Sequence, residues 1–201
     1  MSAVDPTIQT GRDACLNRVL LALGQSPAFP YTGSNQRLAD IESTFDEQTK
    51  EAFLMGWYFN TEPEVEVVPA GAGSTLTMPN GFLNMDPVDP ELNLVIRGNT
   101  FYDLDRRSTN FSGYTSVKFV GIKGLAITET PEQFRTYVIA RTARVYTQRA
   151  EGENEYFAKL LDDETRALAA LQSWEFRSRD RTTFSYPPMA ALHYRRNRRW
   201  Y

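Results

Sequence analysis

The sequence holds a single cysteine, Cys15, and a single histidine, His193, among its 201 residues. A disulfide needs two cysteines, and zinc sites are built mainly from clustered cysteines and histidines, so a disulfide framework and a Cys/His zinc site are both excluded. A serine or cysteine triad would have to recruit His193 from the C-terminal tail, and chain termini hold catalytic geometry poorly. The sequence also lacks a Walker loop, an HExxH motif and a GxSxG motif. We therefore expect no catalytic residues, no metal and no cofactor.

Long apolar runs are missing as well. The longest, AFLMGWYF, begins at Ala52 and is far shorter than the ~20 residues that cross a bilayer. The opening stretch, MSAVDPTIQTGRD, lacks the apolar core of a signal peptide. We expect a soluble protein that is made in a cytoplasm and has no membrane partner.

Positive charge is scarce except at the C-terminal end. From Trp174 onward seven arginines face only Glu175 and Asp180, a net charge of +5, so residues 1–173 carry −8 of the total of −3. A negatively charged body is a poor general binder of nucleic acid, because phosphate contacts need concentrated Lys and Arg. The basic residues of this end are Arg177, Arg179, Arg181, Arg195, Arg196, Arg198 and Arg199.

Four segments repeat apolar residues at helical spacing. The first covers residues 11–23 and ends before Gly24, and the second starts after Ser34 and reaches about Trp57. The third begins at TPEQF, residues 130–134, where a threonine at the N-cap, a proline at the first helical position and a glutamine three residues after the cap mark a helix start. Gly152 interrupts the pattern, and the fourth helix is expected to end near Arg177.

Between these helices, residues 61–128 alternate apolar and polar side chains. The runs EVEVVP, STLTMP, LNLVIRG, NTFYDL and SVKFVGIKGLAI are separated by the turn-rich stretches AGAG, NGF, DPVDP and STNFSG. No helical segment lies between them to serve as a crossover, so the pattern predicts five or six short antiparallel strands.

The element order predicts an α+β protein. We expect a four-helix module, residues 1–60 and 129–178, built from an N-terminal and a C-terminal helical hairpin. An antiparallel β module, residues 61–128, is inserted between them, and an extended basic C-terminal arm, residues 179–201, follows. Trp57, Tyr58 and Phe59 lie where the second helix passes into the β module, and we interpret them as an aromatic plug in that joint.

Two motifs could carry chemistry but have simpler explanations. GAGST, residues 71–75, has the glycines of a phosphate cradle, but it links two strands and is interpreted as a tight turn. The carboxylates Glu62, Glu64 and Glu66, together with Asp103 and Asp105, could form a glycoside-hydrolysing pair across neighbouring strands. Solvated strand faces produce the same alternation, and we favour that explanation.

Five motifs carry a resemblance to a known family. They are LNRVLLALGQSP, LMGWYFNTE, IRGNTFYDLDRRSTNF, ITETPEQFRTYVIARTARVYTQRAEG and LLDDETRALAAL, and they span residues 11 to about 175. In this order they resemble the tail tubular protein A family of short-tailed phages, whose members form the adaptor ring between the portal and the tail nozzle.

The resemblance implies a structural virion protein of the tail that is not an enzyme. It implies a ring of twelve copies that binds the portal and the nozzle, tubular protein B, and lets double-stranded DNA pass through its lumen without sequence-specific binding. It also implies assembly in the host cytoplasm. An acidic body suits a DNA conduit, because a basic lumen would hold phosphates.

The arm is the expected partner-binding segment. Residues 183–201 contain Pro187 and Pro188 and should be extended, with a reach of at most ~60 Å. Arginine and large aromatic side chains are enriched at interface hot spots, so we expect the arm to bind the portal or a neighbouring subunit. Two other functions stay open. The protein could bind nucleic acid through this arm, or it could be an envelope-glycan hydrolase carried in the tail. The candidate binding residues are Tyr194, Arg195, Arg196, Arg198, Arg199, Trp200 and Tyr201.

Overall fold

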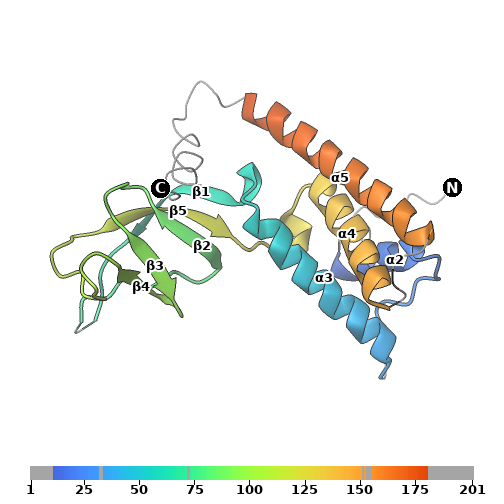
Figure 1. Ribbon diagram of the computed structural model, residues 1–201, viewed down its shortest axis with the longest axis horizontal. Coiled ribbons are helices and arrows are strands. Elements are labelled where there is room, and N and C mark those ends of the chain that lie inside the picture. Colours follow the sequence, from blue (N-terminus) through green and yellow to red (C-terminus); the bar gives the residue numbers. More distant parts are fainter. Residues whose placement is uncertain (1–10, 32–33, 72, 151, 153–154, 181–201) are drawn as a thin grey trace.

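The computed structural model describes residues 11–31, 34–71, 73–150, 152 and 155–180. It confirms the α+β class and the four predicted helices, with five antiparallel strands between the second and the third (Figure 1). α4 starts at Glu132, one residue after the proline that was predicted as its first residue. The hydroxyl of Thr130, the predicted N-cap, donates a hydrogen bond to the carbonyl of Ile127, and the carbonyl of Pro131 accepts the N–H of Arg135. The elements are α2 (Arg12–Ala22), α3 (Gln36–Leu54), the short 3-10 helix η1 (Tyr58–Asn60), β1 (Thr61–Val67), β2 (Phe82–Pro87), β3 (Leu94–Arg97), β4 (Thr100–Asp103), β5 (Val117–Lys123), a second 3-10 helix η2 (Ile127–Glu129), α4 (Glu132–Ala150) and α5 (Glu155–Asp180).

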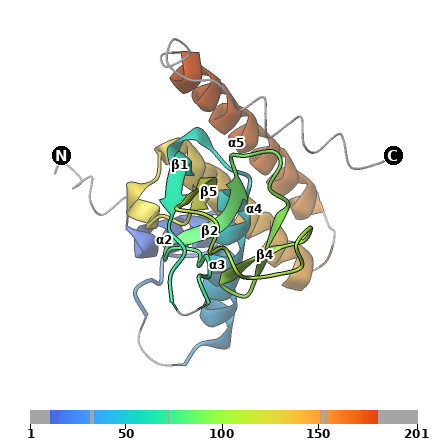
Figure 2. The same ribbon diagram turned by 90° about the vertical axis from the view of Figure 1, so that its left-hand side faces the viewer.

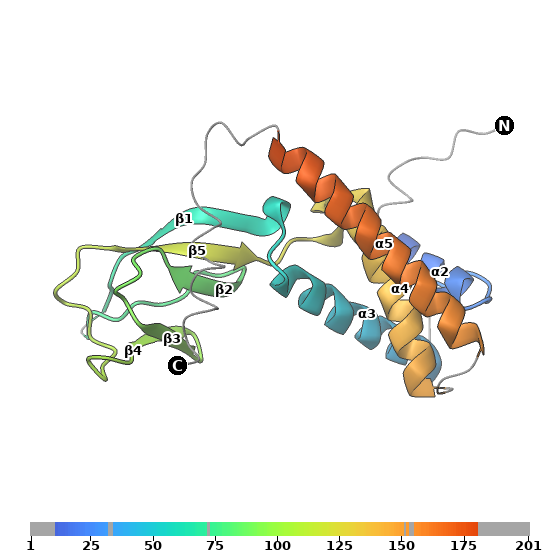
Figure 3. The ribbon, with the colours of Figure 1, turned by 45° about the horizontal axis from the view of Figure 1, so that its top comes forward.

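The helical part is organised around α4. This helix packs against α2, α3 and α5, whereas α2 and α3 contact each other much less. α5 runs along α4 and forms the outer layer of the helical part (Figure 3). The sequence explains the central position, because buried side chains cover more than one side of α4, so it can serve several neighbours at once.

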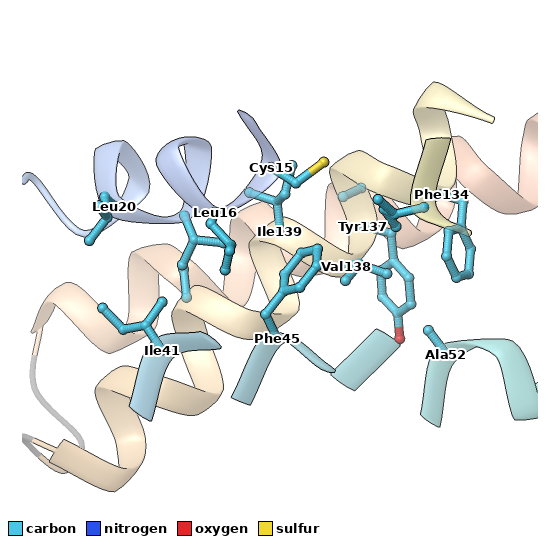
Figure 4. Close-up of a cluster of buried hydrophobic side chains, with 14 of the residues drawn as sticks. Cys15, Leu16, Leu20, Ile41, Phe45, Ala52, Phe134, Tyr137, Val138 and Ile139 are labelled. Atoms are coloured by element: carbon cyan, nitrogen blue, oxygen red, sulfur yellow. The ribbon is translucent and has the colours of Figure 1, made fainter. Parts of the chain in front are cut away.

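One hydrophobic cluster fills the space between the helices. Phe134, Tyr137 and Val138 of α4 are buried at helical spacing, and Phe45 of α3 and Leu16 of α2 pack toward them (Figure 4). A buried side chain of this size contributes about 1.5–3 kcal/mol relative to an exposed one, so these residues dominate the stability of the helical part.

A second cluster lies between two small sheets. The larger sheet has the strand order β1-β5-β2, and β3 and β4 form a separate hairpin. Phe101 of β4 stacks on Phe119 of β5 with ring centroids 4.3 Å apart, so the two sheets face each other across a shared core. Each sheet consequently keeps one face turned away from that core, on opposite sides of the β region.

The positions of two strands correct the sequence prediction. STLTMP, residues 74–79, is not a strand, because only single bridges form there, at Thr75 with Ala70 and at Thr77 with Thr100. Instead FLNMDP, residues 82–87, is β2 and pairs with β5. The glycine turn before Phe82 and the proline at position 87 look like loop signals, but Met85 is buried and the pairing with β5 decides the conformation.

Candidate assembly surfaces

The aromatic residues at the joint occupy the predicted place. Trp57 is buried, donates its indole N–H to the carbonyl of Ala52 at 2.8 Å, and lies edge-on to Tyr137. Phe59 packs against Phe134 and Trp174, so it ties η1 to α4 and α5. The interpretation as a plug is correct for these two residues.

Asn60 links the helical part to the β region by hydrogen bonds. Its side chain is buried, and its amide nitrogen donates to the carbonyl oxygens of Phe53 at 3.1 Å and Lys123 at 3.0 Å. Its amide oxygen accepts the backbone N–H of Trp57 at 2.8 Å. One side chain thus connects the end of α3 with the end of β5, and the joint is tightly specified.

Apolar side chains are exposed beside this joint. Met55 and Tyr58 are 48% and 43% exposed, and Phe176 near the end of α5 is 68% exposed. The backbone N–H of Tyr58 donates to Glu175 at 3.2 Å, which places this part of α5 against η1. α5 is described to Asp180, three residues beyond the predicted end, so its last described turn lies close to Phe176.

Ion pairs join the helices along their seams. Arg141 of α4 donates to Gln48 at 2.6 Å and to Glu51 at 2.7 Å on α3, and it lies 3.8 Å from Glu164 of α5. Arg144 also donates to Glu164, which is buried. Burial lowers the pKa of Arg141, but its hydrogen bonds with Glu51 and Tyr137 outweigh this effect and raise its pKa above the ordinary value. Since a buried charge is costly without partners, these contacts fix the relative positions of α3, α4 and α5.

The seam between α2 and α4 is charged as well. Arg18 of α2 and Arg135 of α4 both donate to Glu132, at 2.7 Å and 2.9 Å. Burial raises the pKa of Glu132, but these hydrogen bonds outweigh it and hold its pKa below the ordinary value.

Two of the candidate hydrolytic carboxylates, Glu64 and Asp103, lie on different sheets. Asp103 is buried at the end of β4, where its carboxylate accepts the backbone N–H groups of Asp105 and Arg106 at 2.9 Å each. Glu64 lies on β1 of the other sheet and is ion-paired with Lys118 at 3.3 Å. β1 and β4 are not neighbouring strands, so Glu64 and Asp103 do not form the pair across neighbours that the sequence left open. The favoured explanation, a solvated strand face, is correct for Glu64, which is exposed, and wrong for Asp103, which is buried.

The remaining motifs have structural roles or lie outside the described residues. GAGST forms the predicted tight turn, with Gly71 at φ +78° and the N–H of Ser74 donating to the carbonyl of Gly71. No group of three metal-ligating side chains occurs within the described ranges. The same residues contain no helix that combines the length and the apolar composition needed to cross a membrane. His193 and the predicted arm residues, Tyr194, Arg195, Arg196, Arg198, Arg199, Trp200 and Tyr201, lie outside the described residues.

A comparison with protein-family models shows which family the chain belongs to. The Tail tubular protein model matches residues 13–181, which include all the described helices and strands from Asp13 onward. The chain belongs to the tail tubular protein family. Tail tubular proteins are structural components of phage tails, so this chain is a tail component of a virion. None of the curated proteins matches the chain.

Membership of a tail protein family offers an explanation for the exposed apolar side chains beside the joint. A tail component works inside an assembly, where apolar and charged faces are covered by other subunits. Sequence reasoning missed the exposed apolar group beside the joint, although its signal was the aromatic run that continues past the end of α3. In a tail tubular protein, Met55, Tyr58 and Phe176 are therefore candidate assembly contacts.

Proposed function

We propose that this chain is the ring-forming adaptor that joins the phage portal to the tail nozzle. Twelve copies close into a ring, and double-stranded DNA passes through its lumen during ejection without sequence-specific binding. The protein assembles in the host cytoplasm and does no catalysis. The observation that carries the proposal is the family match, because it extends over both hydrophobic clusters and not over one of them alone.

Each of the two hydrophobic clusters belongs to a module with its own binding partners. Residues 1–60 and 129–178 form the helical module that contacts neighbouring subunits and the portal, and residues 61–128 form the β module that faces the nozzle. The ion pairs along α4 support this assignment, because a subunit that transmits load between two partners needs helices held in fixed positions. The nozzle partner is tubular protein B.

The arm, residues 179–201, docks on the portal or on a neighbouring subunit. Its candidate contacts are the arginines and aromatic residues from Tyr194 to Tyr201. The last described turns of α5 support this role, because they bring the start of the arm close to the exposed side chains of Tyr58 and Phe176. Arginine forks that bind carboxylates, together with aromatic anchors, can make a contact that is weak singly and strong when repeated around a ring.

Binding order tests the adaptor role. The full chain is mixed with purified portal rings, with purified nozzle protein, or with both, and the complexes are separated by sedimentation. An adaptor binds the portal, and nozzle protein sediments with the portal only when the chain is present. Nozzle protein that binds the portal equally well without this chain would contradict the proposal.

A further inference from the structure

The β region presents two unlike outward faces. Alternation along the strands fixes them, because Val67 and Phe119 of the large sheet and Phe101 of the hairpin point into the shared core. Their neighbours along each strand point away from it. The two faces lie on opposite sides of the β region, and β1 and β4 are well separated in the end view (Figure 2).

The outward face of the large sheet, here called the sheet face, is acidic with two exposed valines. Its residues include Glu64, Glu66, Val68, Asp86, Val88 and Lys118, and the half-buried Val120 is opposite Asp86 in the register. Val68 and Val88 are 61% and 44% exposed, and Val88 still donates its N–H to the carbonyl of Lys118 at 2.9 Å, so it extends the sheet by one position. This face carries three carboxylates and a single ammonium group, that of Lys118, which is paired with Glu64. Glu66 accepts a hydrogen bond from Ser116 and forms no ion pair with any described residue.

The outward face of the β3–β4 hairpin, here called the hairpin face, is cationic and apolar. It includes Val95, Arg97 and Tyr102, with Thr100 directly opposite Arg97 in the register. Val95 and Tyr102 are directly opposite each other in the register, and the guanidinium carbon of Arg97 lies 3.5 Å from the centroid of the Tyr102 ring. Within the part of the chain that the structure describes, Arg97 has no carboxylate partner, unlike most arginines of the helices. Stacking on Tyr102 holds the guanidinium group in place and leaves its N–H edge available for a carboxylate.

We propose that the hairpin face of one subunit binds the sheet face of the next copy in the ring. This inference rests on the proposed ring and names one of its contacts. Each face carries a charged residue two positions from a valine, Glu66 with Val68 and Arg97 with Val95. An antiparallel approach sets Arg97 against Glu66 and the valines against each other. The contact is heterologous, since two different faces meet, and repetition of a heterologous contact closes a ring when the rotation allows it.

A second copy explains both faces, whereas a nucleic acid explains only one. Arg97 on its aromatic support could bind a phosphate, but the carboxylates of the sheet face would repel a polyanion. A neighbouring copy supplies a carboxylate for Arg97 and covers two exposed valines in the same step. Charge complementarity thus favours a second copy.

Charge exchange tests the contact in the full chain. Arg97→Glu and Glu66→Arg are each mixed with purified portal, and closed rings on the portal are counted by electron microscopy. Either variant alone should lower the ring yield at least about tenfold, because it sets like charges opposite each other. An equimolar mixture of the two variants should restore the yield. When the two variants alternate around the ring, every contact joins either two native faces or two exchanged faces.

Controls distinguish the loss of this contact from misfolding of the variant and from failure of the ring proposal. Arg107→Glu makes the same change of charge as Arg97→Glu at an exposed position of the turn after β4, outside both faces, and should leave ring yield unchanged. All variants should keep their thermal transitions within about 4 °C of wild type, because exposed charge changes cost little stability. If the mixture stays defective, Arg97 meets another partner and the inference is wrong, while the ring proposal stands. The inference also fails if both single variants form rings normally. If the wild-type chain itself forms no ring on the portal, the proposed function fails with it.

Discussion

Replacing Asn60 by alanine should uncouple the helical part from the β region. The change removes three hydrogen bonds, to Trp57, Phe53 and Lys123, from a side chain that is 2% exposed. The Phe53 carbonyl keeps its bond from the N–H of Gly56, so the main cost falls on the N–H of Trp57 and the carbonyl of Lys123. A buried polar group left unpaired costs about 1–3 kcal/mol, so we expect a loss of about 3 kcal/mol in the free energy of unfolding.

The assay is thermal and urea unfolding of the full chain. For a protein of this length, 1 kcal/mol shifts the midpoint by roughly 2–4 °C, so the Asn60→Ala variant should melt about 6–12 °C below wild type. Asn110→Ala is the matched control, because Asn110 is exposed and its side chain accepts one bond, from the N–H of Ser112. It should change stability by less than about 0.5 kcal/mol. Equal losses for both variants would refute the reasoning that Asn60 specifies the joint.

Three further predictions concern groups elsewhere in the chain. Burial raises the pKa of the Cys15 thiol, so a thiol reagent at neutral pH should label Cys15 only after unfolding, and rapid labelling of the native protein would show that α2 opens. The pKa of Glu132 is lowered in the folded protein, so its ion pairs stabilise the fold above the unfolded pKa of about 4.3 and lose that contribution as the pH falls through the folded pKa. Because Glu132 is about half exposed, Glu132→Gln should cost less than about 1 kcal/mol at pH 7 and nothing in strong acid; a cost independent of pH would contradict the ion-pair account. Deleting residues 183–201 should leave the thermal transition nearly unchanged while abolishing attachment to the portal; normal attachment of the shortened chain would exclude the arm as the docking segment.

Local pattern was enough to predict the helices. Phe134, Tyr137 and Val138 repeat at helical spacing on α4, and the proline at position 131 marks its start within two residues. The class followed from the order of the patterns, since helical periodicity flanks a block of alternation. Helices depend on contacts between residues three and four apart, and a sequence displays these directly.

The strands depended on contacts that the sequence does not display. β2 follows a glycine turn and ends at Pro87, and its partner is β5, more than thirty residues later. STLTMP has the better alternating pattern but finds only single bridges, because its neighbours in space offer no continuous ladder. The stacking of Phe101 on Phe119 is equally non-local, and it is this contact that turns the two outward faces to opposite sides.

Some residues of the joint could be predicted from local sequence and others could not. The aromatic run at the end of α3 was a visible signal, and Trp57 and Phe59 occupy the joint as expected. Nothing in the local sequence distinguishes Asn60 from a solvent-exposed asparagine, because its role comes from a carbonyl on a distant strand. The predicted binding residues of the arm stay a prediction.

Imaging of the full chain on purified portal by cryo-electron microscopy tests the central claim most directly. The account predicts one closed ring, twelve copies around a central channel, with the helical module against the portal and the β module at the far end. Single copies scattered over the portal, or no density beyond the portal at saturating concentration of the folded chain, would contradict it.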